Sequence, residues 1–322
     1  MYIITGAAGF IGFHLSHLLL KKNVQVIGID NINDYYDVSI KKDRLQILTK
    51  FPNFTFLKLD LSNKKEISKN LKKLKKRVKV IIHLAGQAGV RYSIYNPETY
   101  IKNNIMAYIH LLEYFKNTNV KLILYASSSS VYGEKGSKKS ISSKIQNKPI
   151  SVYSASKLSL ELISNVYNHL YGINFVGIRF FSVYGPWGRP DMFYLKLLNK
   201  INSNKIINIY NKGNHYRSFT YIDDVIENIL KIIKKFNKKN IKICDVFNIG
   251  NPTSISLKKF IKIIEKKVGY KVKKAFIKKQ PGDIFLTKSN INRERKIFGH
   301  KIYTNLNVGL DKLIDWYNKY YN

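Results

Sequence analysis

The stretch YIITGAAGFIG, residues 2–12, decides the fold of this chain. Apolar residues, most of them β-branched or aromatic, precede three glycines at positions 6, 9 and 12, and the amphipathic pattern FHLSHLLLKK follows over 13–22. The first run predicts a β-strand over 2–5, and the second predicts a helix. Glycines at such a junction allow a tight turn and a close approach of the helix to the strand. The stretch therefore indicates a strand-loop-helix unit of an α/β protein.

The rest of the chain repeats this alternation of apolar runs and helical patterns, which predicts βαβ units and a parallel sheet. Beyond the first strand, five runs predict strands over 24–29, 54–60, 78–85, 121–128 and 174–181. Six strands with crossovers make a doubly wound, Rossmann-type sheet in a first domain over 1–180. Prolines interrupt the pattern beyond it, so we expect a smaller second lobe over 181–322. Segments near 219–250 are expected to return to the main domain, among them VFNIG at 246–250.

The glycine-rich loop has the composition of a dinucleotide site. A helix N-terminus offers amide donors and positive potential to a pyrophosphate, and Gly6, Gly9 and Gly12 let the phosphates approach the backbone. Asp30 ends the second predicted strand, 18 residues after Gly12, where a carboxylate can bind a ribose diol. It would repel a 2′-phosphate, so NAD is favoured over NADP. Asp60, after the third strand, is a candidate contact for the adenine amino group. The alternative interpretation of the three glycines is an ordinary strand-to-helix turn.

The stretch VYSASKLSLEL, residues 152–162, predicts the first turns of an amphipathic helix. Tyr153 and Lys157 stand four positions apart and so share one helical face. A fixed ammonium beside a phenol stabilises the phenolate and lowers the phenol's pKa, which makes the tyrosine a candidate base. A chance pair on a solvated face is the alternative.

Composition excludes several classes of protein. With 322 residues, 45% of them hydrophobic, and no apolar run that approaches a membrane span, we expect a soluble globular protein. The N-terminus has no basic leader, and a single cysteine, Cys244, rules out an internal disulfide framework. These features predict a cytoplasmic protein.

The formal charge of +36 raises the question of nucleic acid as a partner. Only eight of the 56 basic residues are Arg, and the Lys residues are spread through helix and strand patterns rather than gathered in one tail. We therefore expect no nucleic-acid partner and interpret most of the charge as a solvated face that attracts anionic small molecules. No cluster has metal-ligand spacing, and His83, inside a strand pattern, is expected to be a core residue.

Five stretches in one order resemble the extended short-chain dehydrogenase/reductase proteins that modify nucleotide sugars. They are TGAAGFIG (5–12), HLAGQAGVRYS (83–93), SSSSVYG (127–133), YSASK (153–157) and RFFSVYGPWGRPDM (179–192). Two more, DNINDYYDVSIKKDRL (30–45) and RSFTYIDDV (217–225), are similar to the UDP-glucuronate 4-epimerase subgroup. The resemblance extends from residue 1 to about 320.

The resemblance implies a role for each matching residue. Tyr153 matches the catalytic base, Lys157 the residue that lowers its pKa, and Ser128 the hydroxyl that orients the sugar O4, with an uncertainty of one position within 127–130. Its cofactor-binding set is Gly6, Gly9, Phe10, Ile11, Gly12, Asp30, Asp60, Leu61, Leu84, Ala85, Tyr153 and Lys157. Its substrate-binding set is Arg91, Ser129, Ser182, Arg189 and Arg217. Relatives often form homodimers through a four-helix contact, so we expect the same here.

The function implied is the redox-neutral C4 epimerisation of UDP-glucuronate to UDP-galacturonate, through a 4-keto sugar and with bound NAD. Gln280 before Pro281 is typical of the glucuronate subgroup, and Ser130 stands where relatives that decarboxylate carry an acid. Three alternatives stay open: a UDP-glucose 4-epimerase, a UDP-uronate decarboxylase, and a catalytically idle NAD-fold binding protein. The intact Tyr153, Lys157 and Ser128 disfavour the last.

Overall fold

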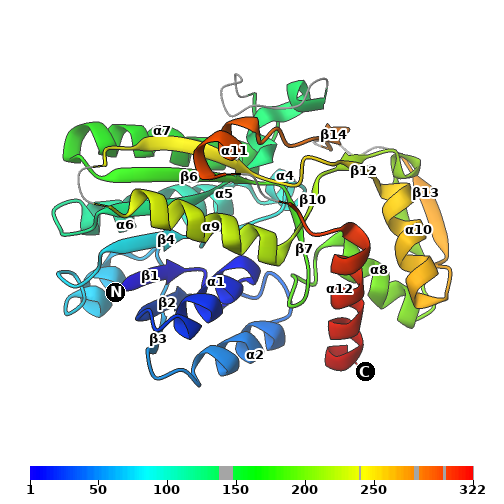
Figure 1. Cartoon of the computed structure of the whole chain (residues 1–322), viewed down its shortest axis with the longest axis horizontal. Helices are drawn as coiled ribbons and strands as arrows, with labels where there is room; N and C mark the ends of the chain where they lie inside the picture. The colour runs from blue at the N-terminus through cyan, green and yellow to red at the C-terminus, as the bar shows by residue number, and fades with distance from the viewer. Residues whose placement is uncertain (138–147, 239–240, 279–282, 300–301, 322) are drawn as a thin grey trace. The chain divides into compact units, whose positions relative to one another are not determined.

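A computed structural model describes residues 1–137, 148–238, 241–278, 283–299 and 302–321, drawn in colour in Figure 1. The chain divides into two compact units. The first unit comprises Met1–Val131, Pro149–Arg179 and Asn228–Phe247. The second unit comprises Tyr132–Lys148, Phe180–Glu227 and Asn248–Asn322.

A seven-stranded sheet with the strand order β11-β6-β5-β4-β1-β2-β3 forms the centre of the first unit. The pairs β1/β2, β1/β4, β2/β3 and β4/β5 are parallel. The strands are β1 (Tyr2–Thr5), β2 (Val26–Asp30), β3 (Phe54–Lys58), β4 (Val80–His83), β5 (Leu122–Ser128), β6 (Asn174–Phe180) and β11 (Cys244–Ile249). The strand order reverses between β1 and β4, and ligands of doubly wound sheets bind at the carboxyl ends of such neighbours.

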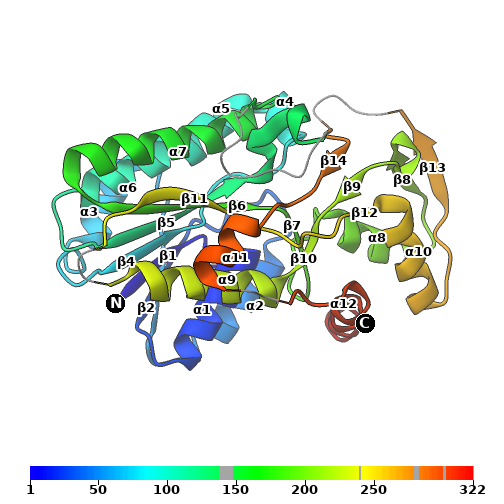
Figure 2. The ribbon, with the colours of Figure 1, turned by 45° about the horizontal axis from the view of Figure 1, so that its top comes forward.

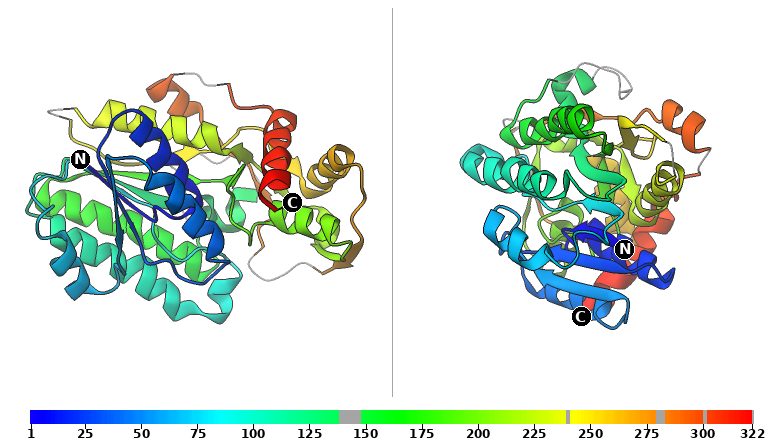
Figure 3. Two further views of the ribbon diagram at one scale, coloured as in Figure 1. Left: turned by 90° about the horizontal axis from the view of Figure 1, so that it is seen from below. Right: turned by 90° about the vertical axis from the view of Figure 1, so that its left-hand side faces the viewer.

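Helices cover both faces of this sheet, as Figures 2 and 3 show. One face carries α1 (Phe10–Lys21) and α2 (Ser39–Leu48); the other carries α3 (Lys64–Leu71), α6 (Ala107–Phe115) and α7 (Val152–Tyr171). The short elements α4 (Tyr92–Tyr95), α5 (Pro97–Tyr100) and the π-helix η1 (Ile101–Met106) precede α6, and the 3-10 helix η2 (Ser129–Ser137) follows β5. Every residue of β4 and β5 is buried, as expected for strands covered on both faces.

The six predicted strands are confirmed, with ends that differ by up to two residues. The sheet has a seventh strand, because β11, which contains most of the VFNIG stretch, lies beside β6 at the sheet edge. The predicted doubly wound fold is therefore confirmed, with seven strands instead of six.

The second unit contains three small sheets, with the orders β10-β7, β12-β9-β14 and β13-β8. Their strands are β7 (Ser182–Tyr184), β8 (Ile207–Tyr210), β9 (Tyr216–Arg217), β10 (Phe219–Tyr221), β12 (Ile255–Ser256), β13 (Lys274–Ile277) and β14 (Leu286–Thr287). Its helices are α8 (Phe193–Asn202), the 3-10 turn η3 (Asn211–Gly213), α10 (Leu257–Val268), α11 (Asn292–Phe298) and α12 (Leu306–Tyr321); α9 (Ile222–Phe236) belongs to both units. Within the described ranges, none of these helices or those of the first unit is long and apolar enough to cross a membrane.

Candidate active site

The glycine-rich loop lies between β1 and α1 and is shaped by close backbone contacts. Gly6 has a φ of +72°, and a Cβ atom there would lie 2.8 Å from the Ala85 amide nitrogen. A Cβ atom on Gly12 would lie 2.1 Å from the Gly6 carbonyl oxygen. Neither position tolerates a side chain. The first turn of α1, which begins after Gly9, holds no acidic residue and no side-chain cap, so its amides suit an anionic ligand.

Asp30 ends β2 beside this loop. Its carboxylate accepts hydrogen bonds from the Ala8 amide at 3.1 Å and the Ile32 amide at 2.9 Å. Burial raises the pKa of Asp30, while the amide of Ile32 and the positive charge of Lys41 act in the opposite direction. The carboxylate thus holds the loop and stands at the carboxyl end of its strand, where a ribose diol is bound in this type of fold.

The other residues of the predicted cofactor set follow neighbouring strands. Leu84 and Ala85 come directly after β4, and their amides donate to the backbone oxygen and the hydroxyl of Thr5, each at 3.1 Å. Asp60 and Leu61 follow β3, and the Asp60 carboxylate accepts a hydrogen bond from the Ser62 amide at 2.8 Å. Phe10 and Ile11 begin α1. All these residues lie at one edge of the sheet, because the strands they follow are parallel.

This edge fits a dinucleotide. The cradle between Gly6, Gly12 and Ala85 would be filled by any Cβ atom, so its glycines keep open a backbone surface that phosphates can approach. The donors are amides, and Asp30 supplies an acceptor for hydroxyls. These residues would hold the pyrophosphate and the adenosine ribose of NAD.

Helix α7 carries Tyr153 and Lys157 one turn apart. It begins with a capping box, in which the Ser151 hydroxyl accepts from the Ser154 amide and the Ser154 hydroxyl accepts from the Ser151 amide, each at 3.1 Å. Lys157 is buried, and burial lowers the pKa of its ammonium to about 8. The ammonium nitrogen would lie 3.4 Å from a Cβ atom on Gly86, so this glycine leaves room beside it.

The last two residues of β5, Ser127 and Ser128, have different hydrogen-bond partners, so the structure distinguishes two serines that the sequence alone could not. The Ser127 hydroxyl donates to the Glu161 carboxylate at 2.5 Å and is buried. The Ser128 hydroxyl instead accepts a hydrogen bond from the Ser130 amide at 3.1 Å. Successive side chains of a strand point to opposite faces. The Ser127 side chain points into the interior, where Glu161 binds it, and Ser128 points to the opposite face. Of the two serines, Ser128 is therefore the better candidate for the hydroxyl that meets a ligand.

A buried ion pair joins α7 to the sheet. Arg179 on β6 donates from Nε to one Glu161 oxygen at 2.8 Å and from Nη2 to the other at 2.6 Å. Both side chains are almost fully buried. Glu161 stands one turn after Lys157 and also accepts from Ser127, so it connects α7 with β5 and β6.

Asn104 is a residue that the sequence analysis missed. It is fully buried in η1, and its amide group donates to the Gln87 carbonyl oxygen at 3.1 Å and to the Ser156 hydroxyl at 2.8 Å. Its side-chain oxygen accepts from the Gln87 amide at 2.7 Å. The bonds tie the loop after β4 to α7. The sequence offered one signal for Asn104, a polar residue inside the helical pattern that precedes residue 112. Its place in a π-helical turn is a second sign, since such turns are frequent at functional sites.

The predicted substrate set is divided between the units. In the first unit, Arg91 is exposed before α4, and Ser129 begins η2. In the second unit, Ser182 pairs with Phe219 in the β7/β10 sheet, and Arg217 donates to the carbonyl oxygens of Tyr216 and Phe285 at 2.9 and 3.2 Å. Gln280 lies outside the described residues.

The Arg189 guanidinium forms a two-point ion pair with the Asp191 carboxylate, at 3.0 and 2.9 Å. Its charge is therefore balanced by a neighbour two residues away, a pairing that the sequence analysis did not foresee.

His83 lies in the core of the first unit. It is fully buried in β4, contacts the Thr5 hydroxyl at 2.9 Å through Nδ1, and stacks on the Tyr108 ring. Burial lowers the pKa of His83 to about 3, so its ring is neutral. Within the described ranges, no three His, Cys, Asp or Glu side chains are grouped to hold a metal ion.

Two proteins of known sequence are similar to this chain over nearly its whole length. Protein CapI from Staphylococcus aureus is 42% identical over 99% of this chain and 98% of its own length. UDP-glucuronate 4-epimerase 4 from Arabidopsis thaliana is 40% identical over 99% of this chain and 76% of its own.

Among solved structures, the UDP-glucuronic acid 4-epimerase of Bacillus cereus, in complex with UDP-glucuronic acid and NAD, superposes with a TM-score of 0.91. It is 34% identical, and the match covers 99% of each chain. The sequence profile of the NAD dependent epimerase/dehydratase family matches residues 2–250. The chain, with its seven-stranded sheet and its glycine-rich loop, belongs to the NAD dependent epimerase/dehydratase family.

Proposed function

We propose that this protein interconverts UDP-glucuronate and UDP-galacturonate by epimerisation at C4, with NAD bound throughout. The observation that carries the proposal is that Tyr153 and the buried Lys157 stand one turn apart on a helix of the unit that also holds the dinucleotide cradle. The glucuronate substrate is supported by the relatives named for that activity.

In this proposal Tyr153 takes the proton of the sugar 4-hydroxyl, and Ser128 orients that hydroxyl through a hydrogen bond. Lys157 stabilises the phenolate, because a cation held in a poorly solvated site interacts strongly with a neighbouring charge. Bound NAD accepts the C4 hydride and returns it to the other face of the keto sugar. No net oxidation results, so NAD is expected to co-purify with the protein.

Arginines of the substrate set suit an anionic substrate. We assign Arg217 to the diphosphate, for which a guanidinium fork is well shaped, and Arg91, Ser129, Ser182 and Arg189 to the sugar and uracil. A 4-keto uronate can lose carbon dioxide, so the carboxylate must be held near the plane of the ketone. Ser130 carries no charge that would repel this carboxylate, which favours epimerisation over decarboxylation.

Incubation with a panel of UDP-sugars tests the proposal. UDP-glucuronate should be converted faster than UDP-glucose, and the product should keep its carboxylate. Faster turnover of UDP-glucose would place the protein with the galactose-type epimerases, and release of a UDP-pentose would make it a decarboxylase. Salt-sensitive DNA binding without turnover of any UDP-sugar would favour the idle binding protein.

The Asp30→Ala variant is expected to bind NAD at least about tenfold more weakly, since a hydrogen bond to a charged group contributes about 1.5–3 kcal/mol. Titration of apoprotein with NAD measures the change. The nearby, exposed Asp34 provides a matched control, and Asp34→Ala should leave the affinity unchanged. Equal affinities for the Asp30 variant and the parent would contradict the ribose assignment.

Turnover is expected to fall above about pH 8. The pKa of Lys157 is lowered to about 8, so its ammonium is charged below this pH and loses its proton as the pH rises through it. The neutral amine no longer stabilises the Tyr153 phenolate. A profile of kcat/KM against pH should therefore decline on its alkaline side, and a level profile up to pH 10 would exclude this role of Lys157.

We propose further that the protein is a homodimer. Leu162, Val166 and Leu170 repeat every four residues on α7 and are 59%, 54% and 61% exposed. Ile101 and Met106 on η1, which packs against α7, are also exposed. Two helices with an exposed apolar face per chain would form a four-helix contact with a second copy.

Replacing Val166 with glutamate should convert this dimer to a monomer, because the contact would bury an unpaired charge twice. Light scattering after gel filtration measures the mass, and circular dichroism checks that the fold is kept. A monomeric parent protein, or a variant that stays dimeric, would rule out α7 as the interface.

A further inference from the structure

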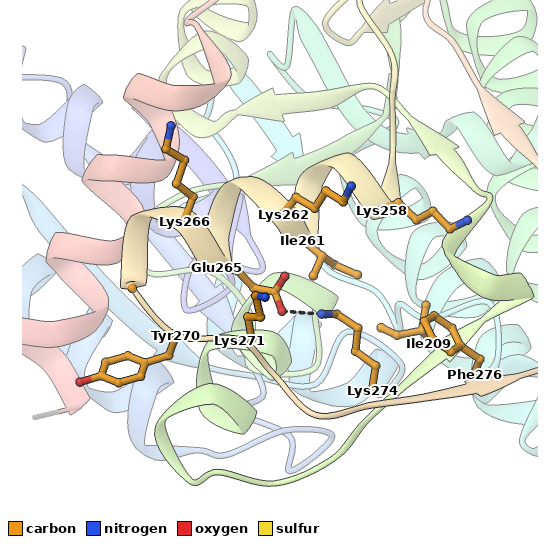
Figure 4. Close-up of a pocket in the computed structure, with 11 residues that line it drawn as sticks. Ile209, Lys258, Ile261, Lys262, Glu265, Lys266, Tyr270, Lys271, Lys274 and Phe276 are labelled. Carbon is orange, nitrogen blue, oxygen red and sulfur yellow. Dashed lines mark hydrogen bonds and ion pairs between the residues drawn. The ribbon is translucent and has the colours of Figure 1, made fainter.

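The second unit contains a pocket of about 730 Å³ between α10 and the β8/β13 pair. Figure 4 shows its residues. Ile209 on β8 and Ile261 on α10 are buried and form the floor, and Phe276 on β13 adds an aromatic wall that is 58% exposed. The volume lies within the range of small-molecule sites.

Five lysines are among the residues that line the pocket. Lys258 and Lys262 stand one turn apart on α10, and Lys274 lies on β13. Lys271 comes from the segment that joins α10 to β13, while Lys266 points away from Ile261 in Figure 4.

The carboxylate of this pocket is already engaged. Glu265 accepts from the Lys274 ammonium at 2.5 Å and from the Val272 amide at 2.9 Å. Among the described residues, Lys258, Lys262 and Lys271 have no carboxylate within ion-pair distance. The mouth of the pocket therefore carries a net positive charge that no neighbouring acid balances.

The lining determines which ligand chemistry fits. An ammonium donates hydrogen bonds and accepts none, so the polar end of a ligand must be an acceptor and is best an anion. A nucleobase or a sugar also needs acceptors for its own donors, and the carboxylate that could serve is paired with Lys274. The aliphatic floor makes no hydrogen bonds and suits an alkyl chain.

We propose that the α10–β13 pocket binds one molecule of an amphiphilic anion, an alkyl chain that ends in a phosphate. The chain covers Ile209, Ile261 and Phe276, and Lys258 and Lys262 bind the phosphate. The site is independent of the proposed epimerase activity. Such a ligand comes either from solution or from an anionic bilayer, and the two sources share this chemistry.

Calorimetric titration of the full chain with decyl phosphate, below its micelle concentration, tests the site. We expect saturable binding with one molecule per chain, and at least tenfold weaker binding of inorganic phosphate and of decyl maltoside. The Lys258→Glu/Lys262→Glu variant should bind decyl phosphate at least tenfold more weakly. Glutamate at position 258, in the first turn of α10, suits the helix dipole, and circular dichroism checks that the double variant keeps its fold.

A matched control changes the charge equally in the first unit. The Lys69→Glu/Lys73→Glu variant alters two exposed lysines four positions apart and should retain the affinity within twofold. Phe276→Ser should weaken decyl phosphate and leave the response to inorganic phosphate unchanged. Equal losses in the two charge variants, or equal binding of decyl phosphate and inorganic phosphate, would overturn the proposal.

Sedimentation with vesicles distinguishes the two sources of the ligand. Binding to phosphatidylglycerol vesicles but not to phosphatidylcholine vesicles, lost in the Lys258→Glu/Lys262→Glu variant and kept in the control, would support the site with a bilayer lipid as its ligand. Calorimetric binding without vesicle binding would support the site with a free amphiphile.

Discussion

The Tyr153→Phe variant is expected to lose at least about a thousandfold in turnover while it retains NAD. A general base contributes about 10²–10⁴ to the rate, and here it must also drive the hydride step by forming an alkoxide. Phenylalanine keeps the ring and its edge contact with Tyr100 but removes the hydroxyl. Initial rates with UDP-glucuronate, together with the NAD content of the purified protein, measure the two effects separately.

A second tyrosine on the same helix provides the control. Tyr171 ends α7, about five turns beyond Tyr153, and its hydroxyl accepts a hydrogen bond from Lys116 at 3.4 Å. Tyr171→Phe removes the same atom and should leave turnover within twofold. If Tyr153→Phe kept its activity within tenfold of the parent, Tyr153 would not be the base.

Removal of the Glu161 carboxylate is expected to lower the free energy of unfolding by about 3–5 kcal/mol, the usual cost of leaving one member of a buried ion pair without its partner. In Glu161→Ala, the Arg179 guanidinium stays buried on β6 and the Ser127 hydroxyl loses its acceptor. The urea concentration at the midpoint of unfolding should fall accordingly, and α7 should lose its hydrogen bond to β5.

Two further variants separate charge from packing. Glu161→Met together with Arg179→Met removes both charges and should recover part of the stability, as apolar replacements of buried pairs often do. Glu113→Ala breaks the more exposed pair with Lys116 and should have a much smaller effect. A Glu161→Ala variant as stable as Glu113→Ala would show that the buried pair does not hold the helix.

The sheet of the first unit was predictable because its signals are local. A strand that is buried on both faces consists of consecutive apolar residues, which can be recognised in the sequence. Gly6 and Gly12 are required because a side chain at either position would clash with the backbone of the same loop or of the segment after the neighbouring strand β4. The spacing of Tyr153 and Lys157 needs only a helix, and α7 extends from Val152 to Tyr171. Such features depend on periodicity and chain order, which the sequence contains directly.

The missed features depend on contacts between distant residues. Glu161 and Arg179 come together only when α7 packs on β6, and Asn104 meets Ser156 across 52 positions. The choice between Ser127 and Ser128 requires the register of β5. The pocket beside α10 escaped prediction because its walls come from two short strands and a helix, and its lysines read as part of a general surplus of charge.

The central claim is tested most directly with UDP-glucuronate that carries deuterium at C4. If Tyr153 moves the proton while the hydride stays with bound NAD, nuclear magnetic resonance should show UDP-galacturonate with the deuterium still at C4, formed without added cofactor and without label in water. A UDP-pentose with carbon dioxide as the main product, or deuterium lost to the solvent, would contradict the proposed reaction.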